Sequence, residues 1–211
     1  VSSRAAGISE ASGAGGDVVI RTGSLAVTNG SQLTASTEGG GDAGNVEIEA
    51  RESVIFDGKS ADGQFSSAAF SVVASGAPGS GGNVIIRTGS LAVTNGAVLS
   101  ASTEGKGDAG NVEIEASDRV VFEGTSTDGQ FSSAAASLVA SGAEGAGGNV
   151  VIRTGSLDVT NGALLSDSTF GTGNAGNLEI DARDRVVFEG TSANGQFRSA
   201  ATSRVESGAE G

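Results

Sequence analysis

A 66-residue repeat runs through the chain, as the offsets 87 − 21 and 153 − 87 of one recurring segment show. That segment, Arg21–Gly30, returns unchanged as Arg87–Gly96 and with one alanine-to-aspartate change as Arg153–Gly162. A fixed period without insertions is typical of arrays in which each unit packs only on its neighbours. The sequence therefore predicts one continuous domain, with a partial coil at 1–16 and repeat units at 17–82, 83–148 and 149–211.

Within each unit the apolar residues recur with a period of two. The segment Asn111–Ala116 alternates apolar and acidic side chains, as expected of a strand with one buried face. We expect Val112 and Ile114 to point inward and Glu113 and Glu115 to face solvent. Short strands separated by Gly, Asn and Ser turns, without an amphipathic helix between them, indicate an all-β architecture.

The middle unit contains candidates for six strands, which form two coils of three strands each. Because the coils begin at Asn83 and Asn111, a 28-residue coil alternates with a 38-residue coil (111 − 83 and 149 − 111). The whole chain then forms a three-faced parallel β-helix, or β-solenoid, of about six coils. The six expected strands are 83–88, 90–94, 97–102, 111–116, 119–123 and 135–141.

The third unit indicates which residues of the last strand point inward. Arg204 and Glu206 stand where the second unit has Leu138 and Ala140. A charged pair is tolerated at these positions only if they face water. The residues between them, Val73, Val139 and Val205, should therefore be the inward ones.

If equivalent positions of successive coils stack at about 4.8 Å, two columns of side chains, called ladders here, run along the solenoid axis. Asparagine opens almost every coil, and its side chain can hydrogen-bond to the equivalent residue of the next coil. Farther along, arginine alternates with an acidic residue on an outward position, which favours opposite-charge pairing. The corner ladder comprises Asp17, Asn45, Asn83, Asn111, Asn149 and Asn177, and the charge ladder comprises Arg21, Glu49, Arg87, Glu115, Arg153 and Asp181.

The composition excludes several functions. The chain has no cysteine and no histidine, which rules out a thiol nucleophile, a histidine-based triad, a disulfide and an ordinary zinc site. A net charge of −13 opposes binding to nucleic acid and to anionic membranes. No apolar run reaches the roughly 20 residues that span a bilayer. We therefore expect neither a nucleic-acid partner nor membrane insertion.

The ordered motifs Gly82–Ile86, Thr88–Ala97 and Ser100–Thr103, followed by Gly107–Asn111, resemble the repeats of filamentous-haemagglutinin-like exoproteins of the two-partner-secretion type, especially the cyanobacterial ones. The resemblance implies a right-handed parallel β-helix that is secreted through an outer-membrane partner. It also implies exposure at the surface of a Gram-negative-type bacterium. The family's secretion domain and anchoring region have no counterpart here, so we expect an interior segment of a longer chain.

Several features suggest binding or catalysis, but each recurs in every unit. Carboxylate pairs such as Glu113 and Glu115 have the residue types of glycosidase acid–base chemistry, yet their repetition favours a lattice over one active site. We therefore expect no catalytic residue, no bound cofactor and no dedicated metal site. Weak calcium binding in acidic loops such as Gly39–Asp42 is an alternative. The repeated Phe65, Phe131 and Phe197 are interpreted as plugs that fold their loops onto the solenoid wall, with exposed contact points as the alternative.

The expected function is a non-enzymatic, extracellular structural module, a stiff shaft within a long secreted or surface filament. Its partners would be the continuation of the same solenoid, or end-to-end or lateral copies of itself. Lateral contacts could use the loops or the edge that carries Val72 and Leu138. One alternative is the stalk of an adhesin that binds cell-surface or matrix polysaccharide. A second alternative is a polysaccharide-active β-helix enzyme, which fold analogy alone does not support.

Overall fold

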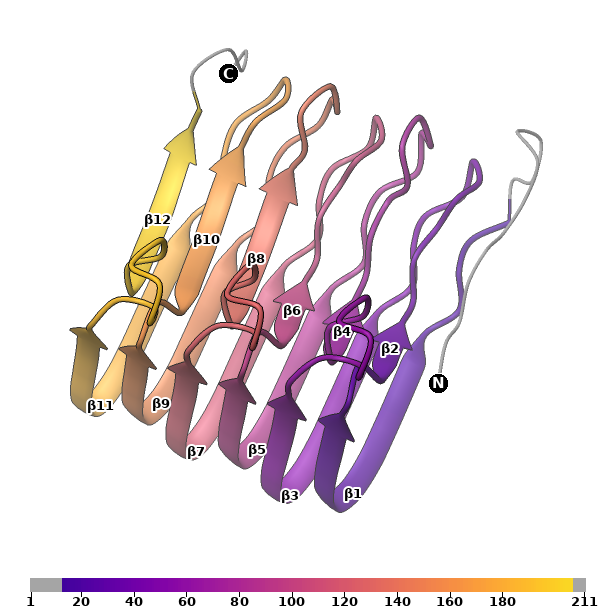
Figure 1. Cartoon of the computed structure of the whole chain (residues 1–211). Helices are drawn as coiled ribbons and strands as arrows, with labels where there is room; N and C mark the ends of the chain where they lie inside the picture. Colours follow the sequence, from indigo (N-terminus) through magenta and orange to yellow (C-terminus); the bar gives the residue numbers. More distant parts are fainter. Residues whose placement is uncertain (1–12, 207–211) are drawn as a thin grey trace.

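The computed structural model describes residues 13–206, and within this range all regular elements are β-strands (Figure 1). The strands form two six-stranded sheets in which all neighbours run parallel. Each coil contributes one strand to each sheet. The predicted parallel β-solenoid is therefore confirmed, but within residues 13–206 each coil has two strands and not the predicted three, so the solenoid has two sheets and not three. A helix able to span a membrane is absent from residues 13–206.

One sheet contains the long strands and the other the short strands. The long-strand sheet comprises, in order, β1 (Val18–Thr28), β3 (Val46–Asp57), β5 (Val84–Thr94), β7 (Val112–Glu123), β9 (Val150–Thr160) and β11 (Leu178–Glu189). The short-strand sheet comprises, in order, β2 (Gln32–Thr34), β4 (Ala68–Phe70), β6 (Val98–Ser100), β8 (Ala134–Val139), β10 (Leu164–Thr169) and β12 (Ala200–Val205).

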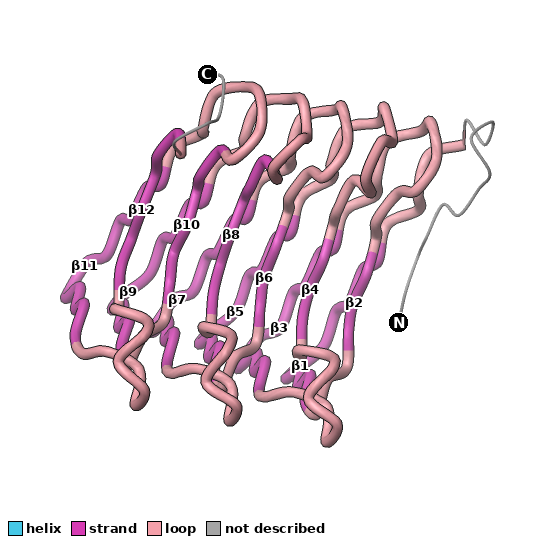
Figure 2. Tube along the Cα trace, turned by 45° about the horizontal axis from the view of Figure 1, so that its top comes forward, coloured by secondary structure: helices cyan, strands magenta, loops and turns pink. Residues whose placement is uncertain are grey.

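Shorter and longer coils alternate along the axis, as the strand register shows. Val18 lies opposite Val46, and Val46 lies opposite Val84. The same alternation continues through Val112 and Val150. The longer coils carry an additional loop between their two strands, and Figure 2 shows these loops side by side along one edge. Most of the partial coil predicted at 1–16, and residues 207–211 of the third unit, lie outside the described residues.

The long strands differ from the prediction: each of them combines two of the predicted strands into one. Strand β5 runs without interruption through Gly89, and the register against β7 shifts between Thr88 and Ser90. Here one glycine lies opposite the two residues Ser117 and Asp118 of the next coil, which is a bulge. A Cβ atom on Gly89 would lie 2.5 Å from the Glu52 carbonyl oxygen. Glycine thus permits the close approach, and the strand bends instead of ending.

The core lies between the two sheets and is built from the predicted inward residues. Val112, Ile114, Val120 and Phe122 are fully buried. Each aligns with an apolar residue of the coils above and below, as Phe122 does with Val93 and Val159. Burial of such stacked aliphatic and aromatic side chains stabilises the fold, at about 25 cal/mol per Å² of apolar area.

Burial decreases at the C-terminal coil, because the described residues place no further coil over it. Val73 and Val139 are fully buried, as predicted. Val205 occupies the same column, opposite Thr169, but is 47% exposed. Val186 and Phe188 of β11 are exposed for the same reason. The last coil therefore presents core side chains and an unpaired strand edge, which is a surface prone to pairing with another strand.

Candidate functional site

The corner ladder is formed by side chains that accept backbone N–H groups. The Oδ1 atom of Asn83 accepts the N–H of Asn111 at 2.8 Å, and Oδ1 of Asn111 accepts the N–H of Asn149 at 2.7 Å. Asp17 begins the series by accepting the N–H of Asn45 at 2.7 Å. The bonds Asn45 to Asn83 and Asn149 to Asn177 complete it. An axial hydrogen-bond chain thus joins all six coils.

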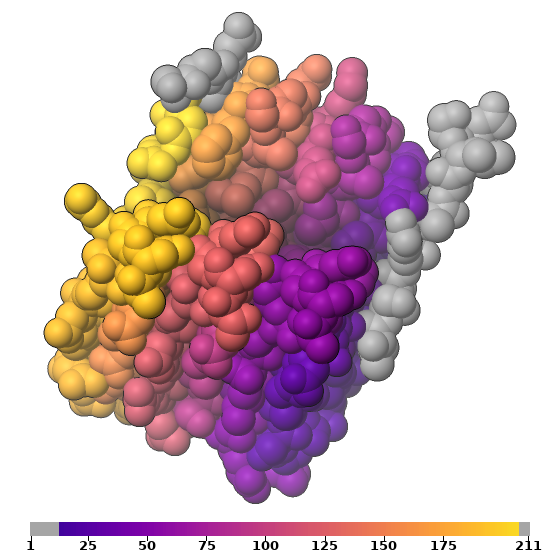
Figure 3. Space-filling model, viewed as in Figure 1, coloured from indigo at the N-terminus to yellow at the C-terminus, as the bar shows by residue number. Residues whose placement is uncertain are grey.

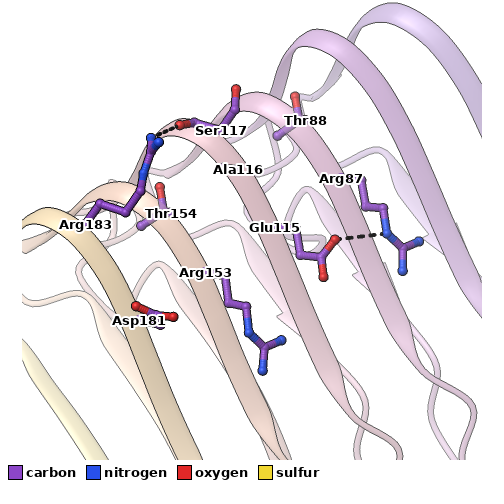
Figure 4. A pocket seen from close by; sticks show the side chains of 9 residues that line it. All are labelled: Arg87, Thr88, Glu115, Ala116, Ser117, Arg153, Thr154, Asp181 and Arg183. Atoms are coloured by element: carbon purple, nitrogen blue, oxygen red, sulfur yellow. Dashed lines mark hydrogen bonds and ion pairs between the residues drawn. The ribbon is translucent and has the colours of Figure 1, made fainter.

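The charge ladder has the predicted register, but its ion pairs are unevenly distributed. Arg21 binds Glu49 at 3.0 Å, and Arg87 binds Glu115 at 3.1 Å. Arg153 lies opposite Asp181 in the register (Figure 4). It nevertheless pairs with Glu179, at 3.2 Å. The shorter aspartate side chain reaches less far across the strands than a glutamate. All these side chains are about half exposed, so each pair contributes only about 0.2–1 kcal/mol.

The carboxylate pairs considered for catalysis lie on this same exposed face. Glu49 and Glu115 each bind an arginine at equivalent positions of successive units. The geometry therefore singles out no carboxylate pair as an acid and base. Within residues 13–206, no group of three acidic side chains lies close enough to hold a metal ion.

A charged cluster where the third unit meets the second was not predicted. Asp158 occurs where the other units have alanine, and its side chain is only 11% exposed. Nη2 of Arg185 donates to both of its carboxylate oxygens, at 2.7 and 2.9 Å. Nε of Arg119 lies 3.4 Å from the same carboxylate. The alanine-to-aspartate change at position 158, the one difference between Arg153–Gly162 and the earlier copies of this segment, was the sequence signal that could have located this cluster.

A second unpredicted feature is a carboxylate inside the solenoid. Asp167 is fully buried, where the second unit has Ala101. Its Oδ1 atom accepts the Gly176 N–H at 3.0 Å, whereas Oδ2 has no hydrogen-bond partner among the described residues. Burial raises the pKa of Asp167 to about 6, although the Gly176 N–H opposes this shift. Asp167 is therefore largely ionised at neutral pH in an unfavourable environment.

The additional loops of the longer coils are compact hairpins, defined here as hairpin loops 58–67, 124–133 and 190–199. In the first, the Ser60 hydroxyl donates to Asp62 at 2.5 Å and accepts the Phe65 N–H at 3.0 Å. The Ser60 hydrogen bond, together with the Gln64 N–H, lowers the pKa of Asp62. Ser126 has the same effect on the pKa of Asp128 in the second loop. These internal bonds give each loop a defined shape.

The interpretation of the loop phenylalanines as plugs was wrong. Phe65 is 53% exposed and Phe131 is 48% exposed, while Phe197 is partly exposed. The reason is that each hairpin is closed by its own hydrogen bonds and leaves the ring outside. The loops pack on each other instead, because Lys59 Nζ lies 3.4 Å from Asp128 and 4.0 Å from the centroid of the Phe131 ring.

The outer face of the short-strand sheet carries a groove, called here the outer groove. Its volume is about 600 Å³, and its lining combines apolar side chains, among them Phe70, Val72, Leu138 and Phe170, with hydroxyl-bearing and other polar side chains. It contains Val72 and Leu138, which form the edge predicted for lateral contacts. The hairpin loops lie elsewhere on the surface, and Figure 3 shows them as neighbouring bulges on the side of the molecule that faces the viewer. The groove is lined by Gln32, Thr34, Ser36, Phe70, Val72, Ser100, Ser102, Thr103, Glu104, Leu138, Ala140, Ser141 and Phe170.

No family model, curated protein or solved structure matches the chain. The resemblance to filamentous-haemagglutinin-like repeats therefore stays a prediction.

Proposed function

We propose that the chain is a non-enzymatic structural module, a stiff shaft within a long secreted or surface filament. The observation that supports this most strongly is the unbroken corner ladder from Asp17 to Asn177. It runs beside two parallel sheets whose hydrogen bonds also lie along the axis. Extending such a rod requires many hydrogen bonds to break together, so the array resists axial load.

The distribution of side chains favours a repeating structural array over a protein with a single active site. The ladders, the hairpin loops and the buried columns recur from unit to unit, and each unit packs on the next in the same way. Quasi-one-dimensional arrays of this kind gain length by adding units without changing their cross-section. Length and stiffness, rather than chemistry, are the properties that such repetition provides.

Electron microscopy of cells that make the protein, with antibodies against the repeat, tests this role. The proposal expects label along the length of fibres of uniform width outside the cell. Label confined to the base of single projections would favour the adhesin stalk, and label inside the cell would contradict the proposal. Release of reducing or unsaturated ends from acidic polysaccharides by purified protein would favour the enzyme alternative.

A further inference from the structure

Each repeat unit contains one Asn–Gly turn, defined here as residues 28–31, 94–97 and 160–163, at the end of strands β1, β5 and β9. The asparagine of each turn has a φ of 54–56°, and the glycine has a φ of 78–91°. The N–H of the last residue donates to the carbonyl of the first at 3.1 Å. Positive φ at both central residues defines a type I′ turn, for which Asn-Gly is a preferred dipeptide. The backbone of the solenoid therefore favours Asn-Gly at this corner of every unit.

The same dipeptide is the one at which a protein chain deamidates most readily, because glycine has no side chain to hinder attack by its own nitrogen. In this reaction the glycine N–H loses its proton to hydroxide, and the nitrogen forms a bond to Cγ of the asparagine. The bond from Cγ to Nδ2 breaks, and Nδ2 leaves as ammonia after taking a proton from water. Water then opens the five-membered imide at either carbonyl, which gives aspartate or isoaspartate. Solvent alone supplies the reactants.

The glycines of these turns cannot be exchanged for a residue that would slow the reaction. A Cβ atom on Gly30 would lie 2.6 Å from the backbone nitrogen of Ser60, and one on Gly96 would lie 2.7 Å from Cβ of Ser126. Both contacts come from hairpin loops, which therefore lie directly against the turns. Together with the positive φ, this close approach restricts the position to glycine. Protection against deamidation must then come from the surroundings of the turn.

A serine at the end of each hairpin loop holds the glycine N–H of one turn. The N–H of Gly96 donates to Oγ of Ser133 at 2.9 Å, and the Ser133 hydroxyl itself donates to the Glu123 carbonyl at 2.7 Å. The proton that the reaction must remove is thus engaged, and Ser133 is fully buried, away from hydroxide. The same pair of hydrogen bonds, at 2.7–3.0 Å, recurs for Ser67 with Gly30 and Asp57 and for Ser199 with Gly162 and Glu189.

The asparagine side chains are held to different degrees. Nδ2 of Asn95 donates to Oδ1 of Asp57 at 2.8 Å, which keeps the amide group away from the glycine nitrogen. Asn161 likewise donates to an acidic side chain of the preceding coil, at 3.3 Å. Asn29 instead donates to the hydroxyl of its neighbour Thr28, at 3.4 Å, which is long for a hydrogen bond and restrains the amide less. Of the three asparagines, Asn29 is therefore expected to deamidate first.

We propose that the three Asn–Gly turns are latent sites of spontaneous deamidation, and that Ser67, Ser133 and Ser199 keep them unreactive in the folded chain. Reaction at Asn95 would place a new carboxylate beside Asp57, where an amide now donates to it, and the two like charges would repel. An isoaspartate would also lengthen the backbone of the turn by one carbon. Either product hinders reclosure, so a transient opening of one coil becomes permanent. The inference goes beyond the proposed shaft function and does not depend on it.

Removing one serine hydroxyl from the full chain tests the proposal. Ser133→Ala leaves the Gly96 N–H without its acceptor. Wild type and variant are incubated in mildly alkaline buffer, and peptide mass spectrometry follows the gain in mass at each turn. Deamidation of Asn95 should become about three- to tenfold faster, the factor that one hydrogen bond represents. The rates at Asn29 and Asn161 should stay unchanged, so the same molecule supplies two internal controls.

Two further variants separate a local effect from general loosening of the fold. Ser67→Ala should move the acceleration from Asn95 to Asn29, because its hydroxyl serves the first turn. Ser132→Ala is the matched control, since it removes the adjacent hydroxyl, which has no hydrogen-bond partner among the described residues. It should leave all rates as in wild type. Asn194 serves as a reference in every sample, because the glycine after it donates to a backbone carbonyl.

Three results would overturn the proposal. An unchanged rate at Asn95 in Ser133→Ala would mean that the serine does not protect the turn. Equal acceleration by Ser132→Ala, or acceleration at all three turns by one change, would mean that loosening of the fold and not the lost hydrogen bond sets the rate. The chain unfolded in concentrated urea gives the unprotected rate, and a folded wild type that deamidates equally fast at these turns would contradict their protection.

Discussion

The side-chain oxygen of Asn83 accepts the backbone N–H of Asn111 at 2.8 Å, one coil farther along the solenoid. Each asparagine thereby supplies the acceptor for an N–H group at the start of the next coil. The recurring asparagine side chains thereby connect each coil to the next along the axis. This relationship also identifies the residues at which the ladder can be interrupted.

Asn111→Ala should lower stability by about 1 kcal/mol, because the Asn149 N–H loses its side-chain acceptor. The melting temperature should fall by roughly 2–4 °C. Asn111→Asp is the matched control, since Asp17 already performs the same role at 2.7 Å. Thermal unfolding followed by circular dichroism compares the variants, and equal stability of Ala and Asp would contradict the ladder.

Glu115→Arg places like charges between Arg87 and Arg153, which lie opposite it on both sides. The variant should lose about 0.2–1 kcal/mol at low salt, where surface charges are poorly screened. Repeating the thermal unfolding at high salt, about 1 M, should recover most of the loss. A melting temperature unchanged at low salt would mean that these exposed positions do not interact.

Asp167→Asn should stabilise the chain at neutral pH. The folded-state pKa of Asp167 is about 6, raised from 3.8, so the folded chain binds this proton more tightly than the unfolded chain. The penalty of the buried charge is absent below about pH 4, develops between pH 4 and 6, and is constant above. A shift of about two pKa units corresponds to up to about 3 kcal/mol.

Urea unfolding of wild type and Asp167→Asn at pH 4 and pH 7.5 measures this difference. The two proteins should be nearly equal at pH 4, and the variant should be more stable at pH 7.5. Asp167→Ala, which restores the residue of the second unit, should gain less because Gly176 N–H loses its acceptor. A pH-independent difference would contradict the assignment.

Asp158→Ala restores the alanine of the other two units and removes the carboxylate shared by Arg119 and Arg185. The half-exposed arginines then lose their counter-charge, and stability should fall by about 1–2 kcal/mol. The double variant Asp158→Ala with Arg185→Ser should be less destabilised than the sum of the two single changes. Additive losses in this cycle would show that the two side chains are energetically independent.

Much of this structure could be predicted from the sequence because the repeat is strict. Once the period was known, the coil lengths, the inward position of Val112 and the column of corner asparagines followed from the spacing. The inward position of Val139 followed from the charged Arg204 and Glu206 at the flanking positions of the third unit. Phe131 could not be placed this way. Its exposure depends on the Ser126 hydroxyl closing the hairpin internally, and the repeat period contains no information about whether a loop folds inward or outward.

The strand register also could not predict which side chains form ion pairs with each other. Arg153 pairs with Glu179 and not with the opposed Asp181 because a long side chain can reach a diagonal neighbour. The continuity of β5 through Gly89 was missed because glycine usually marks a turn, whereas here it permits a close contact within a bent strand. Asp167 interrupts a run of small residues, so its burial could have been suspected from the repeat.

The central claim, that the repeat forms a stiff shaft, is tested most directly by adding repeat units and measuring rod length. Variants with one, two and four extra copies of residues 83–148 are compared by small-angle X-ray scattering. Each added unit should lengthen the rod by about 10 Å, the rise of two coils, at constant cross-section. A cross-section that grows with added units, or increments well below this value, would contradict the account.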